Sequence, residues 1–318
     1  MHTTIKTALR WLGFAIGLAA LAYFAITAIQ QFSSLPPITW GAGTFLALAG
    51  AILANCGALM LSGYAWCLLL RLYAAPVRTA NGIAVFILAQ FARYLPGNIA
   101  HYAGRVVLGK SCSIPAAAAA MSLLIEIGWA LITAASVAAA CFGMADAVLP
   151  PALAAFLPSW LHALLPGAAF AVPIIGAAGF WLWQRFRHGS GTQAGGRTLL
   201  SCLASCFGLY SITFLLIGLA GDALAAGIFG AKESHLVLLT GAFAASWIAG
   251  LLAFGAPAGI GVREVVLLEL LSPAFGPAVA GGLAIALRAA SIAADGLMFV
   301  TAYTLARKSS FFTGASNE

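Results

Sequence analysis

The sequence predicts an all-α polytopic membrane protein with about six transmembrane helices and two re-entrant helical hairpins, arranged as an inverted-topology repeat. Its composition is 63% hydrophobic and only 7% charged, with a mean hydropathy of +1.02. Soluble globular domains carry about a quarter charged residues, so a water-soluble fold could not bury this much apolar surface and lipid must cover it. Two further observations set the architecture: six apolar runs of membrane-crossing length, and two apolar segments that proline and glycine interrupt midway.

Six runs have the length of about 20 apolar residues that a helix needs to cross the hydrocarbon core. They are approximately Arg10–Ile29, Thr44–Leu70, Pro115–Gly143, Ala163–Trp183, Leu199–Leu219 and Pro277–Leu305. The first run has a basic start, which is also typical of a signal peptide. Its apolar stretch is long for a signal peptide and further membrane helices follow. We therefore expect the first run to be an uncleaved anchor.

The distribution of charges predicts the orientation, because loops that face the cytoplasm carry an excess of Lys and Arg. The basic clusters are Lys6 with Arg10, Arg71 with Arg78, Arg105 with Lys110, Arg185 to Arg197, and Arg307 with Lys308. The loops between these clusters hold Asp146, Asp222 and Glu233 but a single lysine, Lys232. We expect a multi-pass protein of the bacterial plasma membrane with both termini in the cytoplasm. The net charge of +7 then reflects membrane topology and anionic lipid rather than nucleic acid.

Two apolar segments, about Thr79–Lys110 and His235–Ser272, are interrupted midway and have short or charged limbs. Proline removes a backbone donor and glycine permits a reversal of the chain. We predict that each segment enters and leaves the membrane on one side. Leu236–Phe254 alone is long enough to span, so a full crossing there stays open as an alternative. The predicted hairpin tips contain Pro96, Gly97 and Asn98 in the first segment, and Pro257, Gly259 and Gly261 in the second.

The order of these elements repeats within one membrane domain that covers residues 1–318. Residues from about 5 to 143 and from about 163 to 306 each follow the order span, span, broken hairpin, span. Three crossings invert the second half relative to the first, a construction found in transporters with the substrate site at the repeat interface. Non-helical backbone at membrane depth is tolerated where it is buried in protein or lines a wet cavity. The alternative is that proline and glycine merely kink packed helices.

Three arginines lie near the expected midplane: Arg93 beside the first break, Arg263 after the second, and Arg288 within the last span. An arginine at the bilayer centre costs about 2.5 to 3.5 kcal/mol on insertion scales, so it needs a reason to be there. Guanidinium forks together with helix N-termini suit a phosphate, and we predict that these three arginines bind the phosphate of a lipid. Acidic residues expected to neutralise them, or to contact a cationic head group, are Glu126, Glu264 and Asp295.

The alternative for these charges is structural: Arg263 would pair with a carboxylate and the other arginines would reach toward the surface. We prefer that interpretation for Arg105, which lies nearer the end of its limb, and expect His101 to pack at an interface. The six cysteines lie mostly in apolar runs without zinc-site spacing. No catalytic motif such as G-x-S-x-G, H-E-x-x-H or a phosphate-binding loop occurs. We expect neither enzyme chemistry nor a metal or cofactor.

The two breaks resemble the signatures of a known family. RYLPGNIAHYAGR, from Arg93 to Arg105, resembles the first signature of the lysylphosphatidylglycerol synthase membrane-region (flippase-like) family. PAGIGVREVVLLELL, from Pro257 to Leu271, resembles its second, with Ala258 where the family usually has glycine. Arg288 matches an arginine common in the last helix of that family. The resemblance covers essentially the whole chain and implies a lipid-translocating membrane domain, here expected to stand alone without the aminoacyl transferase of some members.

These observations together predict a lipid flippase. We expect it to move a phosphate-bearing lipid, a membrane phospholipid or a polyprenyl-phosphate glycolipid, through a polar midplane cavity of the plasma membrane. A separate enzyme would then synthesise that lipid. One alternative is a secondary transporter of a small soluble anion through the same cavity. Another is a non-catalytic membrane partner of a lipid- or glycolipid-synthesising enzyme.

The predicted topology can be tested by single-cysteine labelling at Lys232 and Thr192, in a background without the six native cysteines. The inverted repeat requires a membrane-impermeant maleimide to label Lys232→Cys in intact spheroplasts, and to label Thr192→Cys only after lysis. Labelling of both positions from the same side would break the repeat.

Overall fold

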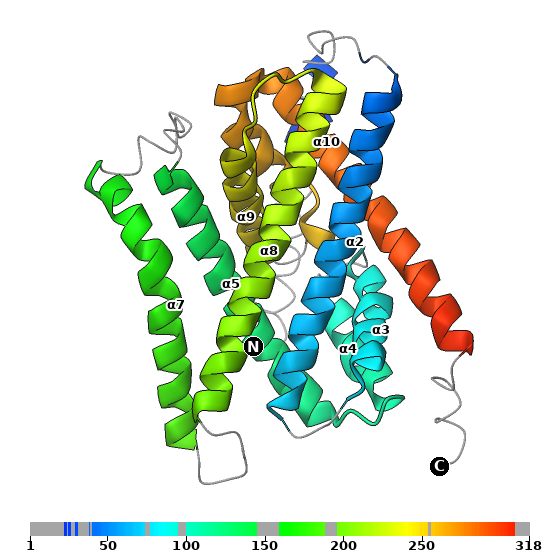
Figure 1. Ribbon diagram of the computed structural model, residues 1–318, viewed down its shortest axis with the longest axis vertical. Helices are drawn as coiled ribbons and strands as arrows, with labels where there is room; N and C mark the ends of the chain where they lie inside the picture. Colours follow the sequence, from blue (N-terminus) through cyan, green and yellow to red (C-terminus); the bar gives the residue numbers. More distant parts are fainter. Residues whose placement is uncertain are drawn as a thin grey trace, which may run out of the picture.

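The chain is described here from a computed structural model that covers residues 40–73, 77–94, 100–144, 159–187, 196–253 and 256–308, with a few single positions between 22 and 38. The regular structure within these ranges is helical, with no strand. The helix axes are mostly aligned with one another, with neighbouring helices running up or down (Figure 1). Most of the first predicted span, Arg10–Ile29, lies outside the described residues.

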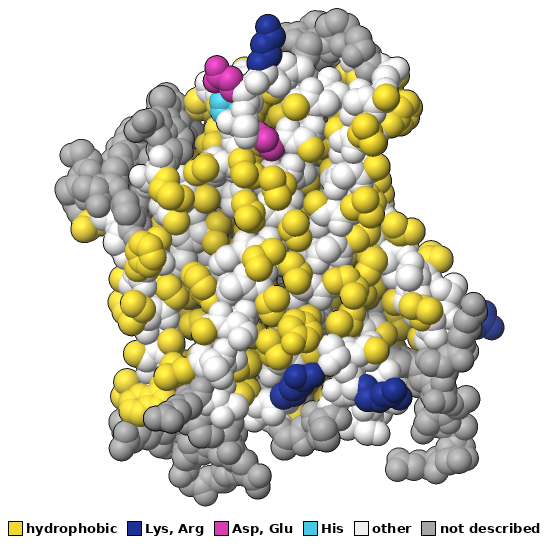
Figure 2. All heavy atoms as spheres, in the orientation of Figure 1, with side chains coloured by type: hydrophobic (Ala, Val, Ile, Leu, Met, Phe, Trp, Pro, Cys, Tyr) yellow, Lys and Arg dark blue, Asp and Glu magenta, His cyan; other side chains and the backbone are white. Residues whose placement is uncertain are grey.

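Four described helices are long and apolar enough to cross a membrane. They are α2 (Ala42–Arg71), α5 (Ala116–Met144), α8 (Gly196–Phe229) and α10 (Val262–Lys308). A further helix, α7 (Ser159–Arg187), occupies the fourth predicted span. Figure 2 shows hydrophobic side chains across the middle of one face, with charged side chains at its two ends. The prediction of a helical membrane protein is therefore confirmed at this level.

The helix boundaries follow the apolar runs closely, with α8 as the exception. This helix continues past its predicted end at Leu219 because the following residues, Ala220–Phe229, stay apolar except for Asp222. Asp222 accepts hydrogen bonds from the Ser234 hydroxyl and the His235 backbone N–H, both at 2.8 Å. Its carboxylate therefore ties the end of α8 to the start of the next helix.

Both predicted broken segments are helix, break and helix in the structure. The first contains α3 (Thr79–Gln90), a 3₁₀ turn η2 (Phe91–Tyr94) and α4 (Ala100–Lys110), and its tip residues Pro96, Gly97 and Asn98 lie outside the described residues. The second contains α9 (Leu236–Leu252), a 3₁₀ turn η3 (Pro257–Gly259) and the start of α10. With 11 residues, α4 is too short to cross a bilayer.

The two broken segments occupy opposite ends of the molecule. In Figure 1, α3 and α4 lie in the lower half, whereas α9 and the first part of α10 lie in the upper half. Gly276, with φ 76° and ψ 156°, breaks α10 between Pro273 and Pro277. This break separates the returning limb of the second segment from the last predicted span, which begins at Pro277.

Corresponding helices of the two halves run in opposite directions. In Figure 1, α2 descends while α8 ascends, and α5 ascends while the later part of α10 descends. An inverted repeat requires this relation. The pair α2 and α8 packs closely, with the Thr44 hydroxyl donating to the Gly227 carbonyl oxygen at 2.9 Å. A Cβ at Gly227 would lie 3.0 Å from the Gly43 carbonyl oxygen, so small residues set the helix separation.

The second break reverses the chain through three left-handed residues within four positions. Ala258 has φ 51°, Gly259 φ 68° and Gly261 φ 85°. Glu264 then accepts a hydrogen bond from the backbone N–H of Gly261 at 2.7 Å and so caps the start of α10. A side chain in the left-handed region costs about 1–2 kcal/mol, so Ala258 is a strained residue at the tip.

We expect Ala258→Gly to raise the free energy of unfolding by about 1 kcal/mol, because glycine adopts this conformation without steric cost. The measurement is denaturant unfolding of the purified protein in one detergent. The matched control is Ala256→Gly, a buried neighbour without positive φ, which should lose about 0.5–1 kcal/mol. An equal loss of stability in both variants would contradict strain at Ala258.

Candidate functional site

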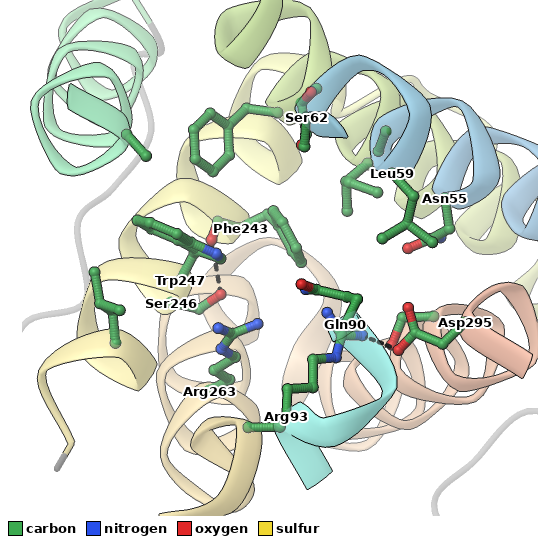
Figure 3. A pocket seen from close by; sticks show the side chains of 18 of the residues that line it. Asn55, Leu59, Ser62, Gln90, Arg93, Phe243, Ser246, Trp247, Arg263 and Asp295 are labelled. Carbon is green, nitrogen blue, oxygen red and sulfur yellow. Dashed lines mark hydrogen bonds and ion pairs between the residues drawn. The ribbon is translucent and has the colours of Figure 1, made fainter. Parts of the chain in front are cut away.

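A cavity of about 190 Å³ lies beside the two breaks and is lined by residues from both halves of the chain. Most of its lining surface is apolar. Figure 3 shows side chains converging on it from α2, α3, α9 and α10. Charged residues are concentrated in this lining although they are rare in the sequence. They are Arg93, Arg105, Arg263, Arg288, Glu126, Glu264 and Asp295.

The first ion pair ties η2, the 3₁₀ turn of the first broken segment, to α10. Arg93 pairs with Asp295, and the Tyr94 hydroxyl donates to the same carboxylate. The Arg288 guanidinium carbon lies 6.0 Å from the Tyr94 ring centroid, within cation–π range. The first broken segment and the later part of α10 are therefore joined by an ion pair at the edge of the cavity.

The second ion pair is the most buried. Arg105, with 2% of its surface exposed, donates from Nη1 to both carboxylate oxygens of Glu126 at 2.8 and 2.7 Å. Its Nη2 donates to Gln90 at 3.2 Å, and its guanidinium carbon lies 3.9 Å from the centre of the Phe86 ring. Bonds to two helices and a ring fix this arginine in place.

The third ion pair stabilises the second tip. Arg288 Nε lies 3.5 Å from Glu264 Oε1, and Arg288 Nη1 donates to the Ala258 carbonyl oxygen at 3.4 Å. Glu264 also caps Gly261, as described above. Arg288 and Glu264 together hold the non-helical backbone of the tip against the last span.

Arg263 differs from the other three arginines because no carboxylate among the described residues pairs with it. Its Nε is buried without a hydrogen-bond partner. Single nitrogens of Arg93, Arg105 and Arg288 also lack partners, but each of these side chains has its own carboxylate. Figure 3 shows Arg263 projecting into the cavity near Ser246 and Trp247 of α9.

Two glycines give Arg263 its position. A Cβ at Gly250 would collide with the Arg263 side chain, and a Cβ at Gly259 would lie 3.0 Å from Arg263 Nε and 2.8 Å from the Gly250 Cα. The close approach of these glycines leaves space for the arginine stem against the backbone. The glycine-rich sequence at the second break therefore positions the Arg263 side chain and also allows the chain to reverse direction.

The structure brings the predicted charged residues to one cavity. Arg93, Arg263 and Arg288 all line it, as do the three predicted acidic residues, Glu126, Glu264 and Asp295. Gly259 and Gly261 lie in the second tip, where Pro257 belongs to the 3₁₀ turn.

The expectation that Arg105 reaches the surface is wrong. The side chain is buried because Glu126 on α5 provides a carboxylate at the same depth. His101, which was expected to pack at an interface, also lines the cavity. A signal was present in the sequence: His101 and Arg105 are four residues apart and so share one face of their short helix.

Other polar groups face the same space without partners in the described part of the chain. They are His101 Nδ1 and the hydroxyl of Tyr210, and both residues are buried. Buried polar groups normally find a hydrogen-bond partner. These two therefore offer additional polar contacts to water or to a ligand in the cavity.

Comparison with protein-family models, with curated proteins and with solved structures finds no match. The resemblance to the lysylphosphatidylglycerol synthase membrane region stays a prediction, carried by the two signatures in the sequence.

The burial of the second ion pair predicts how its variants unfold. Arg105→Met should lower the free energy of unfolding by about 3–5 kcal/mol, because it leaves the Glu126 carboxylate buried without its partner. The double variant Arg105→Met/Glu126→Leu should recover most of that loss, since no buried charge remains. Denaturant unfolding in detergent measures both. Equal losses in the single and the double variant would contradict an uncompensated charge as the cause.

Proposed function

We propose that this chain is a lipid flippase that moves a phosphate-bearing lipid between the leaflets of a bacterial plasma membrane and carries out no covalent chemistry. The observation that carries the proposal is Arg263, a cavity-lining guanidinium without a carboxylate among the described residues. A buried charge without a counterion is costly, and an anionic head group would supply that counterion. The planar guanidinium fork matches phosphate oxygens in a bidentate arrangement.

The proposal places six helices across the membrane, both termini in the cytoplasm, and the two broken segments as re-entrant hairpins. Three features support it. The limbs of each break lie at one end of the molecule in Figure 1, the 3₁₀ turns η2 and η3 are in contact, and both turns contribute to the lining of a cavity that contains charged residues. Irregular backbone at membrane depth needs such surroundings.

A row of aromatic side chains favours a lipid over a soluble substrate. Phe91 lies 5.9 Å from Tyr94 and 5.0 Å from Phe299, measured between ring centroids, and Phe299 stacks on Tyr303 at 6.2 Å. The guanidinium carbon of Arg307 lies 5.7 Å from the Tyr303 ring centroid. The row thus leads from the exposed Arg307 to the residues beside the cavity. It offers acyl chains an apolar contact while the head group passes between basic groups.

Two other functions make different demands on the same residues. A secondary transporter of a small soluble anion would use Arg263 in the same way but has no need of a lipid-facing aromatic row. A membrane partner of a lipid-synthesising enzyme needs no polar cavity, and its buried arginines would all be paired. The unpaired Arg263 argues against the second of these alternatives.

The test is transbilayer movement in liposomes that contain the purified protein and fluorescently labelled phosphatidylglycerol. Arg263→Ala should slow the movement about tenfold or more, because a hydrogen bond to a charged group contributes about 1.5–3 kcal/mol. Arg93→Ala should slow it as well, because it leaves the Asp295 carboxylate beside the cavity without its partner. Arg78→Gln, which removes an exposed arginine at the start of α3, should leave the rate unchanged.

Movement that is unaffected by both alanine substitutions would refute the proposed site. Uptake of labelled inorganic phosphate that depends on Arg263, without any lipid movement, would instead favour the soluble-anion transporter.

A further inference from the structure

The charge balance of the cavity limits the head group that it can accept. Four arginines and three carboxylates line the cavity, so the lining carries one excess positive charge. The residues between the described ranges at both breaks add nothing to this balance, because positions 95–99 and 254–255 contain no charged residue. The excess is carried by Arg263, since each of the other three arginines pairs with a carboxylate.

The paired arginines are not free to serve a second anionic group. Arg105 is held by Glu126, Gln90 and the face of the Phe86 ring. Arg93 shares the carboxylate of Asp295 with the Tyr94 hydroxyl. If a ligand drew one of these arginines away, it would leave a carboxylate unpaired in apolar surroundings, which is the costly outcome for a buried pair.

The fourth arginine is likewise committed to the tip of the second hairpin. Arg288 contacts Glu264 and the Ala258 carbonyl oxygen, and Glu264 in turn caps Gly261. Drawing Arg288 away from Glu264 would therefore release the backbone of the tip. Its Nη2 has no partner and can add a hydrogen bond to a bound anion, but its charge is already balanced by Glu264. The positive charge available to a bound anion is therefore that of Arg263.

Arg93 and Arg288 lie within electrostatic range of Arg263, but each is already paired with a carboxylate. The Arg263 stem lies against Gly250 and Gly259, and the neighbouring wall is aromatic. Phe214 lies 5.9 Å from Trp247 and 6.4 Å from Phe243, measured between ring centroids. The faces of aromatic rings carry partial negative charge, so this wall is unfavourable for a second phosphate.

Building on the proposed function, we infer that the cavity takes a head group with a single negative charge, a phosphodiester seated on Arg263, and rejects head groups that carry a diphosphate. A phosphodiester carries one negative charge, which neutralises the one excess positive charge of the cavity lining. A diphosphate would leave at least one negative charge without a counterion in the buried site.

The test compares binding of two lipids to the full-length protein in detergent by native mass spectrometry: phosphatidylglycerol, a singly charged phosphodiester, and undecaprenyl diphosphate. Wild type should bind phosphatidylglycerol at least about tenfold more tightly, as expected when one close charge pair decides the difference. Arg263→Gln removes the excess charge and should abolish this preference. Arg78→Gln should retain it.

Variants that add positive charge to the cavity lining should shift the lipid preference in the opposite direction, toward the diphosphate. Asp295→Asn keeps the shape of the side chain but raises the excess to two positive charges, and it should shift the preference about tenfold or more toward the diphosphate. Glu126→Gln reaches the same excess from another wall and serves if the first variant does not fold, as judged by gel filtration. Tighter binding of the diphosphate by wild type, or no shift in the folded charge variant, would overturn the inference.

The outcomes separate this inference from the proposed function. Preference for the phosphodiester without transbilayer movement in liposomes would support the charge rule and refute the flippase. Movement of the diphosphate lipid faster than phosphatidylglycerol would refute the charge rule and support the flippase. Competition by glycerophosphoglycerol, the head group without acyl chains, as strongly as by the intact lipid would keep the charge rule and point to a soluble anion.

Discussion

The need to pair each buried charge governs how this molecule holds together. An ionised side chain in an apolar environment is stable only with a partner, and the three carboxylates of the cavity each take one arginine from a different part of the chain. Asp295 holds η2 of the first broken segment to α10, Glu126 holds α4 to α5, and Glu264 holds Arg288 across the second break. The ion pairs thus fix both broken segments, while Arg263 has no carboxylate partner among the described residues.

The backbone of the second break also positions charged side chains of the cavity. Gly250 and Gly259 approach each other so closely that the Arg263 side chain lies against backbone rather than against side chains. The left-handed conformation at Ala258 also turns its carbonyl oxygen toward Arg288. Strain at this tip is therefore coupled to the position of two arginines, which links the reversal of the chain to the chemistry of the cavity.

Much of this arrangement could be predicted from the sequence, because apolar runs bounded by charges and broken by Pro and Gly have few structural solutions in a membrane. The helix limits of α2 and α5 and the second break follow directly. The pairing of the charges could not be predicted, since it depends on helix rotation and depth that the sequence pattern leaves free. Arg105 illustrates the difficulty: it lies near the end of a limb in sequence, yet Glu126 holds it deep in the protein.

The most direct test of the central claim is an experimental structure of the protein in nanodiscs that contain phosphatidylglycerol. We expect phosphate oxygens within about 3 Å of the Arg263 guanidinium nitrogens, with the three other arginines still bound to Glu126, Glu264 and Asp295. A structure in which Arg263 pairs with one of these carboxylates, and the phosphate lies elsewhere, would contradict it.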